Sequence, residues 1–129
     1  MTRGDGVTPI RIMLVEDDAD FRRLMASLFG RQSDLEVVAQ AGSLSEARKL
    51  ADTVSFDVAV LDLGLPDGDG ADLIAVLQRG NPGVRVLIVS ASLDPASIEK
   101  TRRAGGDEIM DKFSSFDEIL STVRRLGGV

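Results

Sequence analysis

Five short apolar runs alternate with five longer amphipathic segments along this chain of 129 residues. Each apolar run has the length of a strand buried on both faces, and each amphipathic segment repeats its apolar residues at helical spacing. Strands that alternate with helices in this way form a parallel sheet with helices on both faces, joined by right-handed crossovers. The expected fold class is therefore α/β, a doubly wound five-stranded parallel sheet. The predicted strands cover residues 10–15, 35–41, 56–61, 84–89 and 108–110.

Capping residues mark the starts of the predicted helices. The pattern Ser-x-x-Glu begins at Ser43 and at Ser115, and this capping box is typical of a helix start. Asp94 is followed by proline, which is favoured at the first helical position. Asp18 or Asp20 can cap the helix that follows the first strand. Apolar residues at helical spacing predict this helix over residues 21–28 and a further helix over residues 70–77.

The composition removes several classes of function. The chain has no cysteine and no histidine, which excludes disulfides, thiolate metal sites, phosphohistidine and catalytic triads built on histidine. Its formal net charge of −6 disfavours direct binding to nucleic acid or to anionic membranes. No apolar run is long enough to span a bilayer. Since the lack of cysteine also fits a reducing compartment, we expect a cytoplasmic protein. We also expect a disordered tail over residues 1–9 and one domain over residues 10–129.

Polar side chains follow the predicted strands at the edge where open α/β sheets bind ligands. Asp62 comes directly after the apolar run at residues 58–61, and a loop rich in glycine follows it. A single acid at such a place is as readily a helix cap or a solvated side chain as it is part of a ligand site. Other polar residues follow other strands in the same way, which makes coincidence a poor explanation. These residues are Glu16, Asp17, Ser90 and Lys112.

This set of side chains predicts phosphoryl chemistry assisted by a metal ion. Three carboxylates placed close together repel one another unless a cation lies among them. Oxygen ligands without histidine or cysteine favour a hard cation, Mg²⁺ or else Mn²⁺. An aspartate carboxylate is a nucleophile for phosphoryl groups, and Lys112 and the metal would neutralise the incoming charge. Ser90 is placed to hydrogen-bond a phosphoryl oxygen.

From residue 10 to about residue 126, the chain resembles the receiver domain of two-component response regulators. The sequence LDLGLPDGDG at residues 61–70 is similar to the phosphoacceptor loop of that family, and the other motif residues occur in the family's order. The resemblance implies the strand order 2-1-3-4-5 and phosphorylation of Asp62 by a sensor histidine kinase or a phosphotransfer protein. It implies a signalling domain and not an enzyme, beyond self-phosphorylation and autodephosphorylation. The sequence looks most like receivers of regulators that carry a helix-turn-helix output domain.

The resemblance also assigns roles to the other residues of the constellation. Ser90 is the switch hydroxyl, and Lys112 pairs with the phosphoryl group. Phosphorylation is then expected to alter the surface built from the fourth helix, the fifth strand and the fifth helix, which the family uses for partners or for a homodimer. The implied Mg²⁺ ligands are the carboxylates of Glu16, Asp17 and Asp62 and the backbone carbonyl of Gly64.

Two positions depart from the family pattern. The switch position before the lysine is usually Tyr or Phe, and here it is Ile109; the residue after the lysine is often Pro, and here it is Phe113. Isoleucine has neither a ring nor a hydroxyl, so we expect a weaker switch that is carried by the loop over residues 90–92. The cations of the fourth helix are expected to face Asp111 and Asp117; they are Lys100, Arg102 and Arg103.

Two other interpretations compete with the receiver. A Mg²⁺-dependent phosphatase with an aspartate nucleophile, similar to the haloacid dehalogenase superfamily, needs a second Asp two residues after the first, where this chain has Gly64. A pseudo-receiver, an interaction module with inactive acids, is disfavoured by the complete set of motif residues. No output domain is expected within residues 10–129, so the sequence suits either a stand-alone receiver or a fragment of a longer regulator.

Overall fold

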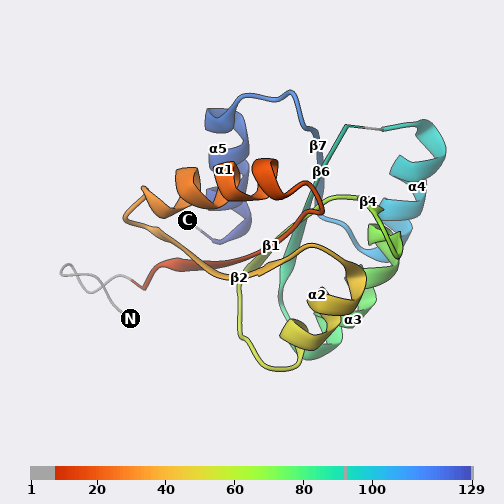
Figure 1. The fold of residues 1–129 in the computed structure, drawn as a ribbon, viewed down its shortest axis with the longest axis horizontal. Coiled ribbons are helices and arrows are strands. Elements are labelled where there is room, and N and C mark those ends of the chain that lie inside the picture. The colour runs from red at the N-terminus through yellow and green to blue at the C-terminus, as the bar shows by residue number, and fades with distance from the viewer. Residues whose placement is uncertain (1–7, 92, 129) are drawn as a thin grey trace.

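The central sheet has five parallel strands in the order β2-β1-β3-β6-β7 (Figure 1). The computed structural model describes residues 8–91 and 93–128, so that most of the predicted tail, residues 1–7, lies outside the described residues. Because β6 and β7 are the fourth and fifth strands of this sheet, the predicted order 2-1-3-4-5 is confirmed. The strands are β1 (Ile10–Val15), β2 (Leu35–Ala41), β3 (Val58–Leu61), β6 (Arg85–Ser90) and β7 (Glu108–Asp111).

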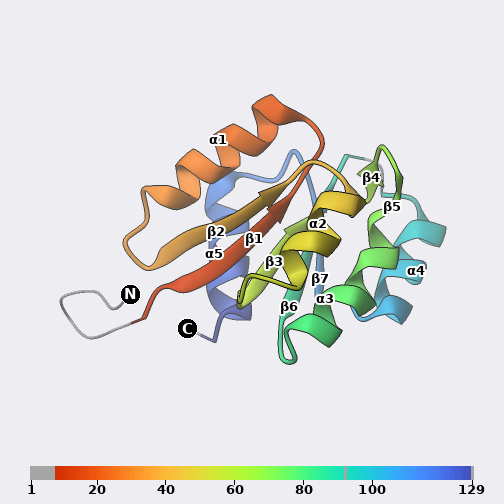
Figure 2. The ribbon, with the colours of Figure 1, turned by 60° about the horizontal axis from the view of Figure 1, so that its bottom comes forward.

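Helices cover both faces of this sheet, as the alternating pattern predicts. α1 and α5 pack on one face, and α2, α3 and α4 lie on the other (Figure 1, Figure 2). Within the described residues, no helix is both long enough and apolar enough to cross a membrane. The helices are α1 (Ala19–Gly30), α2 (Leu44–Ala51), the 3-10 helix η1 (Gly70–Leu73), α3 (Ile74–Gly80), α4 (Pro95–Ala104) and α5 (Phe116–Leu126).

The middle strands supply side chains to two separate apolar layers. In β3, Val58 and Val60 belong to the layer under α1 and α5, whereas Ala59 and Leu61 belong to the layer under α2 and α3. Successive side chains of a strand point to opposite faces, and here both faces are covered. This is why β3 reads as an unbroken apolar run and not as an alternating one.

The side chains at the predicted helix starts act as caps. Ser43 and Ser115 each accept a hydrogen bond from the backbone N–H three residues further on. Of the two candidates for α1, Asp18 is the cap, since its Oδ1 accepts from the N–H groups of Asp20 (3.0 Å) and Phe21 (3.1 Å). Such bonds satisfy donors that the first turn of a helix leaves open.

Several element boundaries differ from the sequence prediction by one to three residues, and two of the differences have a clear structural reason. The third strand begins at Val58 and not at residue 56, because the N–H of Phe56 donates to the side chain of Asn81 (3.1 Å) and not to a neighbouring strand. The helix predicted over residues 70–77 begins as η1, and α3 then extends to Gly80.

A small antiparallel hairpin follows β3, where the sequence predicts only a loop. Its strands are β4 (Gly64–Leu65) and β5 (Gly68–Asp69), joined by a turn of two residues. The backbone of Gly68 has φ of +152°, a value that favours glycine. The hairpin returns the chain to β3: the N–H of Gly70 donates to the carbonyl of Leu63 (2.9 Å), and a Cβ at Gly70 would collide with the carbonyl oxygen of Asp62.

Helix α4 buries fewer residues than the other helices, since Thr101 is its one buried residue. The Thr101 hydroxyl has no hydrogen-bond partner within the described part of the chain. We expect Thr101→Val, which exchanges this hydroxyl for a methyl group, to raise the free energy of unfolding by about 1 kcal/mol. Thermal melts check this as a rise of roughly 3 to 5 °C, whereas Thr101→Ser, which keeps the hydroxyl, should lower the midpoint. A lower midpoint for the valine variant would contradict the assignment.

Candidate functional site

The carboxyl ends of four strands bring the predicted site residues to one edge of the sheet. The N–H of Asp62 donates to the carbonyl of Val15 (3.0 Å), which joins the ends of β3 and β1. The N–H of Lys112 donates to the carbonyl of Ser90 (3.1 Å), which joins the ends of β7 and β6. The strand register thus places Glu16, Asp62, Ser90 and Lys112 beside one another, as the order of the strands predicts.

Three carboxylates form a cluster at the ends of β1 and β3. Each of Glu16, Asp17 and Asp62 offers an oxygen, and these oxygens all lie within 4.8 Å of one another. Glu16 and Asp62 are buried, with 2% and 7% of their surface exposed, whereas Asp17 is exposed. Carboxylate oxygens alone, with one ligand open to solvent, are a donor set that suits a hard divalent cation which keeps bound water.

Lys112 crosses the sheet edge to the two buried carboxylates. Its Nζ lies 2.5 Å from Oε1 of Glu16 and 3.2 Å from Oδ2 of Asp62. The same Nζ lies 4.9 Å from the centre of the Phe21 ring, a cation–π contact. Burial alone would lower the pKa of Lys112, but the hydrogen bonds to Glu16 and Asp62 outweigh it and raise that pKa. The ammonium is therefore held in its charged form.

The acidic cluster carries more negative charge than Lys112 alone can offset. Burial raises the pKa of Glu16 above its ordinary value, and the nearby Asp62 carboxylate adds to the rise, while bonds from Lys112 and from the N–H of Asp18 oppose it. A divalent cation among the three carboxylates would favour their charged forms. The electrostatics of the site thus fit the metal that the sequence predicts.

Asp62 is a member of this cluster and also lines a hollow on its other side. One oxygen, Oδ2, faces Lys112, and the other, Oδ1, accepts a hydrogen bond of 3.3 Å from the N–H of Gly64. The hollow has a volume of about 530 Å³, and residues of the hairpin, β6 and α4 contribute to its lining. A group bound there would contact the Asp62 carboxylate. The polar side chains of its lining are Asp62, Asp69, Ser90, Asp94, Ser97 and Lys112.

Ile109, by contrast, is not brought into this hollow. It is half-buried on β7 and lines a second, smaller hollow of about 240 Å³ with Leu93, Ile98 and Arg102. An isoleucine there contacts the core layer under α2 and α3. Ile109 lies in the middle of β7, whereas the acids lie at the carboxyl ends of their strands, so the strand register keeps Ile109 away from them.

The prediction for the cations of α4 is wrong for Lys100. Its Nζ pairs with Asp69 (3.0 Å) and Asp72 (3.5 Å), and not with Asp111 or Asp117. Sequence reasoning missed Asp69 as a lining residue because its position depends on the unpredicted hairpin. Asp94 caps α4 as the sequence predicts, and it also lines the hollow, which the sequence does not predict.

Comparison with known proteins identifies the family of the chain and supports its fold. The family model of the response regulator receiver domain matches residues 12–124, nearly the whole chain. The chain belongs to the response regulator receiver domain family. The alternative of a Mg²⁺-dependent phosphatase with an aspartate nucleophile is therefore set aside. The domain is a receiver of two-component signalling. Receiver domains bind a divalent metal at an acidic pocket, and this receiver has such a cluster.

Two relatives and one solved structure illustrate the match. The chain is 32% identical to the DNA-binding transcriptional activator DevR/DosR of Mycobacterium tuberculosis, over 92% of this chain and 54% of that protein. It is 30% identical to the chemotaxis protein CheY of Listeria monocytogenes, over 88% of this chain and 95% of that protein. The crystal structure of a LuxR-family response regulator from Aurantimonas has a TM-score of 0.86 at 27% identity, over 94% and 86% of the two chains. The receiver thus spans about half the length of DevR/DosR and nearly all of CheY.

Proposed function

We propose that Asp62 of this receiver accepts a phosphoryl group from the phosphohistidine of a sensor histidine kinase or a phosphotransfer protein. The observation that carries the proposal is that the Asp62 carboxylate belongs to the acidic cluster and also lines the 530 Å³ hollow, with Nζ of Lys112 3.2 Å away. One carboxylate can there face a metal on one side and a phosphoryl donor on the other. The interpretation as a pseudo-receiver does not account for this arrangement.

The ligands of the proposed metal are the Glu16, Asp17 and Asp62 carboxylates and the carbonyl of Gly64, with Mg²⁺ as the ion and Mn²⁺ as a substitute. When bound, the ion supplies positive charge that offsets the transferring phosphoryl oxygens. An oxygen of Asp62 forms the new P–O bond as the P–N bond of the phosphohistidine breaks, and the electron pair stays on the donor's imidazole. Lys112 then loses a carboxylate partner and gains a phosphoryl oxygen, so its charge remains paired.

The test is incubation with acetyl phosphate, with and without Mg²⁺, followed by intact mass and by release of inorganic phosphate. A receiver takes up one phosphoryl group, only with Mg²⁺, and then loses it slowly. A phosphatase would release phosphate continuously at low protein concentration. A chain that stays unlabelled with Mg²⁺ would be a pseudo-receiver, and the proposal would be wrong.

The same proposal extends to the surface that phosphorylation changes. Ser90 and Lys112 both line the hollow, and a phosphoryl group on Asp62 that is bound by both would draw these two side chains inward toward β3. We assign the response to α4, β7 and α5, as a surface for partners or for a homodimer, and the site of action to the cytoplasm. Of the loop expected to carry this response, Ser92 lies outside the described residues.

We expect Ser90→Ala to remove most of the response of α4 to a phosphoryl mimic. With beryllofluoride and Mg²⁺, amide NMR signals of α4 and β7 should shift in the wild type, because the Ser90 hydroxyl donates to the bound group. Ser97→Ala is the matched control, since Ser97 lines the same hollow and donates to Asp94 (3.0 Å) instead. Shifts in α4 that persist without the Ser90 hydroxyl, or a largest displacement at Ile109, would refute this switch.

A further inference from the structure

The turn of the hairpin is anchored to a helix that lies outside the site. The carboxylate of Asp67 uses both oxygens on the first turn of α2: Oδ1 accepts from the N–H of Leu44 (2.8 Å), and Oδ2 accepts from the N–H of Ser45 (3.0 Å). These two bonds lower the pKa of Asp67 below its ordinary value, so the carboxylate is charged at neutral pH. Asp67 therefore clamps the hairpin to α2 with two charge-assisted bonds.

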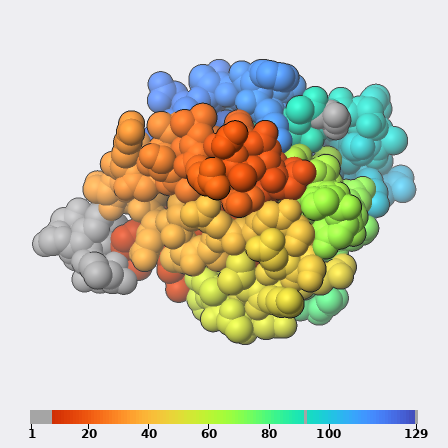
Figure 3. Space-filling model, in the orientation of Figure 1, coloured from red at the N-terminus to blue at the C-terminus, as the bar shows by residue number. Residues whose placement is uncertain are grey.

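The backbone beside Asp67 is seated on the same turn of α2. A Cβ added at Gly68 would lie 2.6 Å from Cδ1 of Leu44, so the end of the Leu44 side chain would have to shift for any larger residue, and the φ of +152° at this position also favours glycine. Figure 3 shows the hairpin, in green, against the yellow atoms of α2. The contact thus has a polar part, made by Asp67, and a packed part, made by Gly68.

Capping alone does not explain why the chain reaches across to α2. Ser43 already caps this helix locally, because its Oγ accepts from the N–H of Glu46 (3.1 Å). Asp67 lies 23 residues further along the chain than Leu44, and it satisfies the two first-turn donors that Ser43 leaves open. The additional effect of Asp67 is to fix the hairpin.

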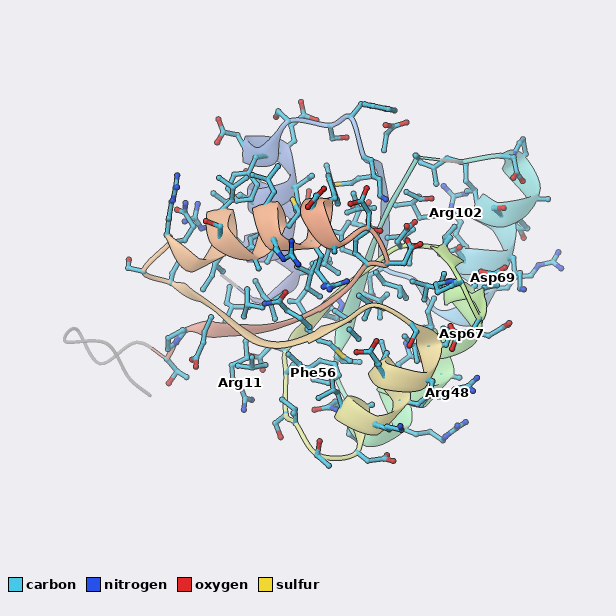
Figure 4. The ribbon with its side chains drawn as sticks, in the orientation of Figure 1. Arg11, Arg48, Phe56, Asp67, Asp69 and Arg102 are labelled. Carbon is cyan, nitrogen blue, oxygen red and sulfur yellow. The ribbon has the colours of Figure 1, made fainter. Side chains whose placement is uncertain are left out.

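The hairpin transmits this anchor to the phosphoacceptor. Gly64 pairs with Asp69 and Leu65 pairs with Gly68, so the turn that holds Asp67 is the tip of a ladder whose base is Gly64. The N–H of Gly64 donates to Oδ1 of Asp62. On the opposite side, Lys100 of α4 pairs with Asp69 (3.0 Å). Figure 4 shows Asp67 toward α2 and Asp69 toward α4.

We propose that Asp67 is a positioning residue of the phosphoacceptor site, which holds the hairpin so that Gly64 stays in place beside Asp62. The inference rests on the proposed function, in which the carbonyl of Gly64 is a metal ligand. Without the clamp, the tip of the hairpin is free to leave α2, and the carbonyl and N–H of Gly64 lose their fixed direction. Asp67 contacts neither the metal nor the phosphoryl group.

The experiment compares Asp67→Ala with Ser43→Ala, which removes a cap from the same helix turn without loosening the hairpin. Mg²⁺ affinity is measured by calorimetry or amide NMR, labelling by acetyl phosphate, and stability by thermal melts. We expect both variants to melt earlier. We expect Asp67→Ala alone to bind Mg²⁺ about tenfold more weakly, as for other residues that orient metal ligands, and to label more slowly. Asp67→Asn can accept only one of the two bonds, so its Mg²⁺ affinity and its rate of labelling should lie between those of Asp67→Ala and the wild type.

Equal Mg²⁺ affinity of Asp67→Ala and the wild type would overturn the inference, and so would an equal loss of affinity in Ser43→Ala. In the second case, Asp67 would be a helix cap and no more. Mg²⁺ binding and phosphoryl uptake by the wild type distinguish these outcomes from a failure of the proposed function. If the wild type itself neither binds Mg²⁺ nor accepts a phosphoryl group, the function is wrong; if it does both, only the role of Asp67 is decided.

Discussion

An Asp62→Asn variant should take up no phosphoryl group from acetyl phosphate under conditions in which the wild type takes up one. The amide has nearly the shape of the carboxylate, and its oxygen can still accept the hydrogen bond that Gly64 donates. It is a far weaker nucleophile, however, and it brings one negative charge less to the acidic cluster. Intact-mass spectrometry of both proteins, with Mg²⁺ present, measures the difference directly.

The control for this experiment is Asp94→Asn. Asp94 lines the same hollow, but its carboxylate accepts from the N–H of Ser97 (2.8 Å) as the cap of α4. Asparagine is an equally good cap, so this variant should fold and label like the wild type. Equal labelling of Asp62→Asn and the wild type would refute Asp62 as the acceptor, and loss of labelling in Asp94→Asn alone would move the acceptor to α4.

Asp17→Ala should weaken Mg²⁺ binding far more than Asp18→Ala. Asp17 offers an oxygen to the acidic cluster, while Asp18 uses its carboxylate to cap α1. Loss of a group that only orients metal ligands costs about 10- to 100-fold in affinity, so loss of a direct ligand should reach the upper value or exceed it. Asp18→Ala should keep the affinity and lose about 1 kcal/mol of stability.

The measurement needs calorimetry or NMR, because the chain has neither Trp nor Tyr to report binding by fluorescence. Thermal melts of both variants provide the control for folding. Similar losses of Mg²⁺ affinity in the two variants would show that the ligand is misassigned by one residue.

Sequence reasoning predicted those features that depend on local patterns or on strand order. Ser43 and Asp94 cap their helices as expected, since a cap acts on the next few residues. The contact of Lys112 with Glu16 and Asp62 was also within reach, because parallel strands end at one edge of the sheet. A correct strand order therefore brings residues together that lie far apart in the sequence.

The missed features depend on geometry that no short pattern encodes. Strands of two residues, such as β4 and β5, are too short to show any periodicity, so the hairpin was predicted only as a loop. The bonds of Asp67 to α2 could not be found without that hairpin. Lys100 was assigned to the wrong acids because helical spacing defines the faces of α4 but not the direction in which each face points. The rotation of α4 is set by packing.

The close contact at Gly70 limits how this stretch of the chain can vary. Any side chain at Gly70 would press on the carbonyl of Asp62, and so on the peptide unit that carries the proposed acceptor. In a saturation mutagenesis experiment, the position would then tolerate no residue but glycine, although Gly70 touches neither metal nor phosphate in the proposed mechanism. Gly70 would then be essential because two backbone segments lie too close for a side chain, and not because Gly70 takes part in the chemistry.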